Sequence, residues 1–151
     1  MVSLANVRCL LVFSDHRQHV CERGLDKASR SLVLLERDLC EIERQVQGLG
    51  ELLVSHRAED QRLSHSQLLA LLRRQAVIRR QIVSLTLDRV RVTDQHQDLI
   101  QEVERLRETR KALQKKHLKY QSLEQRLLAE HRSRFWHQEE NDIEELLVNF
   151  K

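Results

Sequence analysis

The chain has 151 residues, of which 32% are charged and 3% aromatic, with a formal net charge of +3, three glycines and no proline. This length gives one structural unit at most, and the shortage of Gly and Pro excludes a fold built on many tight turns. The nearly balanced charge permits nucleic-acid binding without arguing for it. No apolar run reaches the roughly 18 residues of a membrane span, so we expect no transmembrane helix.

The first predicted element is a long helix over about residues 4–54. Apolar residues recur there at alternating steps of three and four, which is the a/d pattern of a coiled-coil helix. Gly24 lies inside this pattern and is expected to weaken the helix locally. The predicted seam consists of Leu4, Val7, Leu11, Ser14, Gln18, Cys21, Leu25, Ala28, Leu32, Leu35, Leu39, Ile42, Val46, Leu49 and Leu53.

A turn is predicted over about residues 55–64. Ser64 has the position of a helix N-cap, and Gln67 completes an S-x-x-Q capping box. Leu63 and Leu68 occupy the two positions of the hydrophobic staple that flanks such a box. The alternative is one continuous helix through this region, because the nearby glycines are only modest helix breakers.

The second predicted helix covers about residues 65–140. One of its rows is apolar throughout, and the partner row mixes apolar, charged and histidine residues, which lowers stability but fixes register. Residues 139–145 follow as an acidic C-terminal tail, which is expected to fray because carboxylates at a helix C-terminus oppose the macrodipole. The apolar row is Leu71, Ile78, Leu85, Val92, Leu99, Leu106, Leu113, Tyr120 and Leu127, and the mixed row is Gln75, Ile82, Arg89, His96, Val103, Arg110, His117 and Glu124.

Two seams joined by one turn predict an all-α fold, a long antiparallel two-helix coiled-coil hairpin. We expect a single coiled-coil unit over residues 1–151. With the turn near residues 56–63, Leu4 is expected to lie opposite a residue near 110. The second helix should then run on past the start of the first one.

No motif predicts catalysis, a cofactor or a metal, so we expect a non-enzymatic protein. The G-x-x-x-x-G-K-[ST] and G-x-S-x-G motifs are absent, and a two-helix coil lacks the concave pocket of an enzyme. His16 and His19 share a helix face, but no third ligand nearby supports a metal site, which favours ordinary surface histidines. Cys9, Cys21 and Cys40 lack C-x-x-C spacing, and with no signal peptide expected, free thiols in the cytosol fit best.

The basic stretch 105–120, RLRETRKALQKKHLKY, raises the alternative of a DNA-binding basic region followed by a zipper. In such proteins the basic region precedes the zipper. Here the seam residues Leu106, Leu113 and Tyr120 run through the basic stretch itself. The pattern favours a charged coil surface and no nucleic-acid partner.

The stretch LLRRQAVIRRQI, residues 71–82, places a second apolar stripe beside the seam. Arg73 and Arg80 face away from the seam. An apolar edge rimmed by arginine is typical of a helix-docking interface; the alternative is that Leu72 and Val83 only broaden the packing between the two helices. The stripe consists of Leu72, Ala76, Arg79 and Val83, and on the first helix Leu34 and Leu52 also lie outside the seam, with Gln45 between them.

The segment from Leu63 to Ile82, a capping box followed by L-L-R-R-Q-x-x-x-R-R-Q-I, resembles the InvI/SpaM proteins of type III secretion systems. These belong to the YscO/SctO family and are similar to the flagellar export protein FliJ. The resemblance implies an antiparallel two-helix coil similar to the γ-subunit stalk of rotary ATP synthases. It implies a cytoplasmic protein that assembles at the cytoplasmic face of the inner membrane without inserting into it, and a role in virulence.

The same resemblance implies two partners. The paired termini would enter the central pore of the hexameric export ATPase, and the turn end would meet the cytoplasmic domain of the export gate, of the FlhA/SctV family. Some members also bind export chaperones, so a chaperone escort or recycling factor is an alternative function, as is an unrelated coiled-coil adaptor. The implied gate-binding residues are Leu72, Arg73, Ala76, Arg79, Arg80 and Val83.

Overall fold

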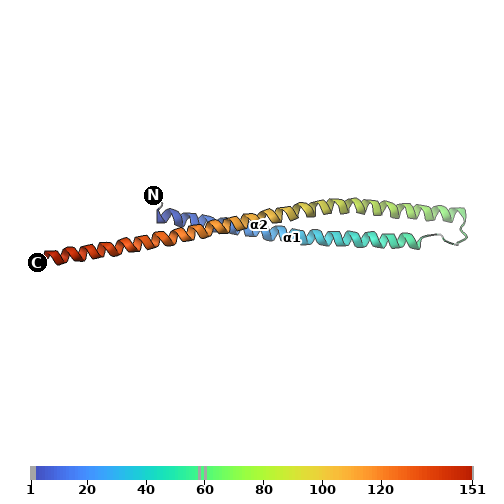
Figure 1. Ribbon diagram of the computed structural model, residues 1–151. Coiled ribbons are helices and arrows are strands. Elements are labelled where there is room, and N and C mark those ends of the chain that lie inside the picture. The colour runs from blue at the N-terminus through green and yellow to red at the C-terminus, as the bar shows by residue number, and fades with distance from the viewer. Residues whose placement is uncertain (1–2, 58, 60, 151) are drawn as a thin grey trace. The chain divides into compact units, whose positions relative to one another are not determined.

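The computed structural model describes residues 3–57, 59 and 61–150 of the protein (Figure 1). Two long helices, α1 (Leu4–Ser55) and α2 (His65–Asn149), contain most of these residues and pack against each other. The described residues include no strand. The predicted all-α two-helix hairpin is therefore confirmed.

The helices divide into two compact units. Unit 1 combines Met1–Leu25 with Arg105–Lys151, and unit 2 is the continuous segment Asp26–Glu104. In each unit a stretch of α1 packs against an antiparallel stretch of α2. The single coiled-coil unit expected over residues 1–151 stays a prediction.

Unit 2 contains the connection between the helices, and α2 begins there with the predicted capping box. The Ser64 backbone N–H donates to Gln67 Oε1 at 2.9 Å, and the Gln67 backbone N–H donates to Ser64 Oγ at 3.3 Å. Each residue thus satisfies a backbone donor that the first helical turn leaves free. The capping box is confirmed and the continuous helix is excluded; Ala58 and Asp60 of the predicted turn lie outside the described residues.

Replacing Ser64 by alanine should lower the free energy of unfolding by about 1 kcal/mol, because the Gln67 N–H loses its acceptor. Urea unfolding followed by circular dichroism measures this loss. Ser84→Ala is the matched control, since Ser84 is exposed within α2 and alanine is the better helix former. Equal stability of the two variants would contradict the cap.

The end of α1 is held by side chains rather than by a glycine. Ser55 Oγ donates to the Leu52 carbonyl at 2.8 Å, and His56 Nδ1 lies 2.7 Å from the same oxygen. Gln75 Nε2 donates to the His56 carbonyl at 2.9 Å. This contact places the end of α1 beside the third turn of α2, so the connection runs along the first turns of α2 (Figure 1).

This asymmetric connection corrects the predicted pairing of the helices. In unit 1, Arg8 Nε lies 3.1 Å from Glu124 Oε1, so Leu4, one turn earlier, lies near residue 128 and not near residue 110. In unit 2, His96 Nε2 lies 3.4 Å from Glu36 Oε1, in the same register. The predicted pairing of Leu4 was wrong because an extended residue spans about twice the length of a helical one. The short extended connection therefore runs alongside about ten residues of α2 before α1 and α2 begin to pair.

Both predicted seams are confirmed by burial. Every residue of the first seam is buried or half-buried, and Val7 is fully buried. The apolar row of α2 is likewise covered, and Arg89 alone in the mixed row is exposed. Because these rows face each other, burial of their apolar surface is the main favourable term in the packing.

The first seam and the mixed row both leave polar atoms inside unit 1. Ser14 Oγ, Arg110 Nε and His117 Nδ1 are buried and have no hydrogen-bond partner among the described residues. An unpaired buried polar group costs about 1–3 kcal/mol. These positions therefore weaken the coil in unit 1, as the polar residues of the seam predict.

Gly24 lies against α2 in unit 1, where a Cβ atom would be 3.7 Å from Leu106 Cδ1. That distance is ordinary van der Waals contact, and glycine inside a helix is less stable than alanine by about 0.5–1 kcal/mol. Gly24→Ala should therefore stabilise the protein by about that amount in urea unfolding. Gly48→Ala is the control for helix propensity alone, because a Cβ atom at Gly48 would have no neighbour within 4 Å. A loss of stability in Gly24→Ala would contradict the packing of Gly24 on Leu106.

The end of α2 lies farther along the chain than predicted, and the fraying of the acidic tail stays a prediction. α2 continues to Asn149, well past the expected end near residue 140. The carboxylates of residues 139–145 lie before the last helical turn, where the effect of the macrodipole is small. Leucine and glutamate in this segment are good helix formers.

Candidate partner-docking surface

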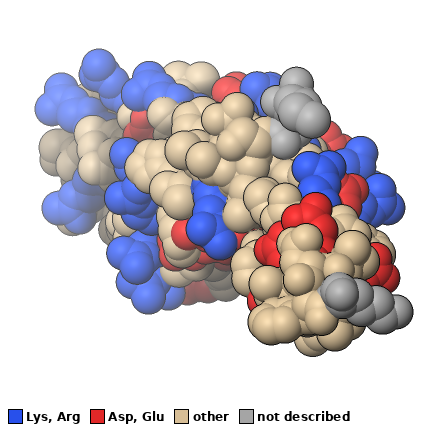
Figure 2. All heavy atoms as spheres, turned by 90° about the vertical axis from the view of Figure 1, so that its left-hand side faces the viewer, with Lys and Arg blue, Asp and Glu red and all other residues tan. Residues whose placement is uncertain are grey.

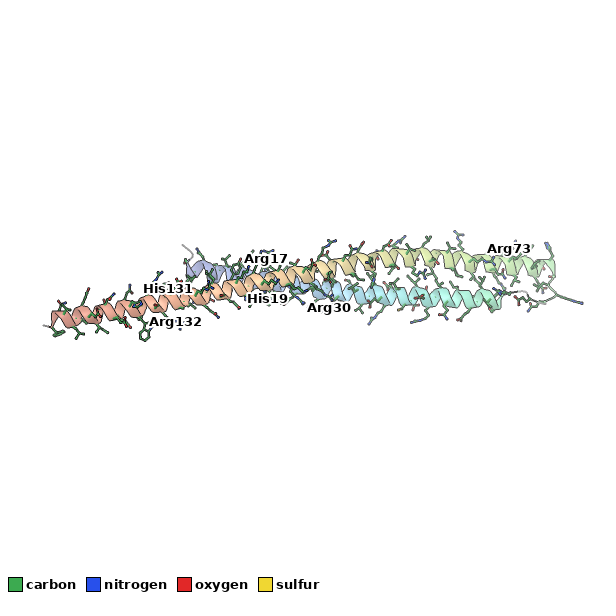
Figure 3. All side chains as sticks on the ribbon, in the orientation of Figure 1. Arg17, His19, Arg30, Arg73, His131 and Arg132 are labelled. Atoms are coloured by element: carbon green, nitrogen blue, oxygen red, sulfur yellow. The ribbon has the colours of Figure 1, made fainter. Side chains whose placement is uncertain are left out.

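The six predicted gate-binding residues all lie in unit 2, on the first turns of α2. Every one of them is exposed, and the side chains of Leu72 and Val83 are 49% and 59% accessible. Arg73 lies near the start of α2 (Figure 3). We call these residues the arginine-rimmed stripe: Leu72, Arg73, Ala76, Arg79, Arg80 and Val83.

The exposure of this stripe argues against the interpretation that its apolar residues only broaden the packing between the helices. Had Leu72 and Val83 broadened the packing between α1 and α2, they would be covered by α1. Their neighbours in the seam, Leu71 and Ile82, are half-buried and Ile78 is buried. The stripe therefore lies outside the seam, and α1 leaves its apolar side chains exposed.

Along α2, the charged residues of the stripe and its neighbours have a single sign. No carboxylate occurs between Gln61 and Leu87, a segment that contains Arg62 and both arginine pairs. Arginine side chains combine a long apolar stem with a charged head, so they extend an apolar surface and rim it at once. The surface fits a partner that is apolar at its centre and acidic at its edge.

Two grooves lie elsewhere on unit 2. One, of about 660 Å³, is lined by Gln45, Gly48, Leu49, Leu52, Gln81, Ser84 and Leu85. The other, of about 540 Å³, is lined by Ser31, Leu34, Leu35, Gln95, Asp98, Leu99 and Glu102. No residue of the arginine-rimmed stripe lines either groove.

The grooves correct the grouping of residues on α1. The sequence suggested that Leu34, Gln45 and Leu52 accompany the stripe, but they line the two grooves instead. The grouping was wrong because a position outside the seam can lie on either flank of the helix. The sequence shows that a residue is outside the seam, but not toward which flank its side chain points. Gly48 and Ser84, whose side chains are small, open the larger groove; small residues beside the seam were the signal that could have indicated it.

A second exposed apolar surface lies at the end of unit 1, and the predicted seams and stripe do not include it. Since Arg8 pairs with Glu124, α2 from about residue 129 onward has no counterpart on the described part of α1. We call residues 129–149 the C-terminal extension. The residues at the near end in Figure 2 are mostly acidic or uncharged. The exposed large apolar side chains of the C-terminal extension are Phe135, Trp136, Ile143, Leu146, Leu147 and Val148.

His19 and Cys21, two residues near the possible metal site of the sequence, have other neighbours in the structure. His19 Nε2 lies 3.5 Å from Asp15 Oδ2, and its Nδ1 lies 3.7 Å from Glu22 Oε2 (His19 is labelled in Figure 3). No group of metal-binding side chains is assembled within the described part of the chain. Cys21 is buried in unit 1, where its thiol donates to the Leu106 carbonyl at 3.3 Å.

Two long helices that pack against each other along buried seams define a coiled-coil protein. None of the helices, over the residues described, is long and apolar enough to cross a membrane. The family model described as "Salmonella surface presentation of antigen gene type M protein" matches residues 5–147, and the chain belongs to this family. The resemblance to the InvI/SpaM proteins is thereby confirmed, and the chain is a type III secretion protein. No curated protein and no solved structure matches it.

Proposed function

We propose that the protein is the non-enzymatic central stalk of a type III secretion system, which links the hexameric export ATPase to the cytoplasmic domain of the export gate. The observation that carries this proposal is the family match over residues 5–147. The antiparallel packing of α1 and α2 supports it, because a stalk needs a stiff element with different surfaces for different partners.

Gate binding is assigned to the arginine-rimmed stripe of unit 2. Its support is the exposure of Leu72 and Val83 together with the absence of carboxylates in the surrounding segment. The gate protein, of the FlhA/SctV family, should offer an acidic rim around an apolar patch. Hot spots in such interfaces are apolar anchors and arginines near the centre.

ATPase binding is assigned to the paired ends of unit 1, where the N-terminal part of α1 and the C-terminal part of α2 lie together. The protein would then act in the cytoplasm, at the cytoplasmic face of the inner membrane when the machine is assembled. Its function would be mechanical and organisational, with no catalytic group and no cofactor of its own.

Binding of the full chain to the export ATPase and to the gate cytoplasmic domain of the same secretion system tests the proposal. Calorimetry should give an affinity for each partner alone, and a ternary complex should elute together in size-exclusion chromatography. Binding to export chaperones with no affinity for the ATPase or the gate would establish the escort function instead. Affinity for none of these proteins would leave an adaptor unrelated to the stalk.

A further inference from the structure

The apolar face of the C-terminal extension lacks a covering partner, and most helical stability in proteins comes from packing such a face against another surface. On a helical wheel of 100° per residue, Phe135, Trp136, Ile143 and Leu146 fall on one face. Trp136 is 66% accessible and Phe135 is 59% accessible. We call this face the C-terminal stripe.

Two charged residues interrupt the C-terminal stripe, and their signs and positions are informative. Arg132 and Glu139 fall on the same face as the aromatic residues and both are exposed. Arg132 lies the same number of residues before the Phe135–Trp136 pair as Glu139 lies after it. An antiparallel copy of this helix, centred between Phe135 and Trp136, therefore places each Arg132 opposite a Glu139.

The apolar residues obey the same symmetry. In this alignment Phe135 of one copy lies opposite Trp136 of the other, and this contact occurs twice across the two-fold axis. Leu128 then lies opposite Ile143. A parallel pair would instead oppose Arg132 to Arg132 and Glu139 to Glu139, and like charges facing each other are unfavourable.

Charges on the flanks of the stripe support the antiparallel alignment as well. On one flank Asp142 falls within two residues of the level of His131, and on the other Glu144 falls within one residue of the level of Arg126. His131 and Arg132 both lie on this last part of α2 (Figure 3). No acidic residue is brought opposite another acidic residue along either flank.

We propose that two copies of the protein associate through an antiparallel, two-fold symmetric pairing of their C-terminal stripes. The pairing covers the aromatic face and joins Arg132 of each copy to Glu139 of the other. It is an isologous interface, in which one surface meets its own copy and closes the assembly at two chains. The inference does not depend on binding to the ATPase or the gate.

Sedimentation equilibrium of the full chain in reducing buffer tests this pairing, from about 1 μM to about 1 mM. The wild-type chain is expected to pass from monomer to dimer in this range. Arg132→Glu and Glu139→Lys, measured separately, should each raise the dissociation constant at least about tenfold, because like charges then meet in the interface. Circular dichroism confirms that each variant keeps its helix content.

Combining the two changes makes the test specific for the alignment. The double variant R132E/E139K should recover association, since the opposite charges have only exchanged places. An equal mixture of the two single variants should also associate, and more tightly than either variant does alone. Trp136, the single tryptophan, reports burial by a blue-shifted emission in the dimer.

Four results would overturn the proposal. The wild-type chain could remain monomeric up to about 1 mM. The double variant could fail to recover association while keeping its helices, or dimers could form whose affinity ignores both charge reversals. Phe135→Ser is the variant for the apolar contact, and unchanged dimerisation in it would likewise place the interface elsewhere.

Discussion

The double substitution Leu72→Asp with Val83→Asp is expected to weaken binding of the export-gate domain by several kcal/mol, or more than about a hundredfold. Both side chains are exposed in the arginine-rimmed stripe, so the chain itself tolerates the change. In a complex, however, two carboxylates would be desolvated at the centre of the interface. Calorimetry with the gate domain measures the effect.

A matched control is available on the same helix. Val77 and Leu87 are exposed to a similar extent but lie outside the stripe, so Val77→Asp with Leu87→Asp adds the same charge elsewhere. This control should bind the gate nearly as well as the wild type. ATPase affinity, assigned to unit 1, should be unchanged in both double variants.

Two outcomes would remove the stripe as the gate site. Unchanged gate affinity in the Leu72→Asp, Val83→Asp variant would show that the partner binds elsewhere. Equal weakening in the control variant would show a general effect of charge. Helix content, measured by circular dichroism, should stay within a few per cent of the wild type in each case, because aspartate lowers helix propensity by less than about 1 kcal/mol per site.

The substitution Leu113→Ala should lower the free energy of unfolding by about 2–4 kcal/mol, because it opens a cavity in the seam of unit 1. Leu113 is only 6% accessible. The lower end of this range applies if the two helices close over the gap. Urea unfolding followed by circular dichroism gives the difference directly.

Leu118→Ala is the control for this cavity. Leu118 lies on the same stretch of α2 but is 62% accessible, so its truncation removes little buried surface and favours the helix slightly. The two variants have the same composition and differ only in whether the truncated side chain lies on the buried or the exposed face of α2. Equal stability of the two would mean that the assigned seam does not carry the packing of unit 1.

The aligned seams show how much of the fold a sequence of this kind contains. A residue that must face another helix recurs with the helical period, and that period is visible in Leu32, Leu35 and Leu39 without any structure. The start of α2 could also be predicted from the sequence, since the capping hydrogen bonds between Ser64 and Gln67 depend on four consecutive residues alone. The predicted end of α2 near residue 140 was wrong because the acidic residues 139–145 were taken to lie at the helix terminus and to oppose its macrodipole. The helix instead ends at Asn149, one to two turns farther on.

The sequence by itself determined that two helices form, which rows of side chains face inward, and that an apolar stripe with arginines lies beside the seam. The tertiary structure decided which residues of α1 meet which residues of α2, as Arg8 with Glu124 illustrates. It also decided that Leu34 and Leu52 line grooves apart from that stripe, and that the C-terminal extension has no counterpart on the described part of α1. The physical reason is that helical periodicity is local, whereas the register of two helices depends on the path of the connection between them, which hydrogen bonds such as Gln75 to His56 fix only in the folded chain.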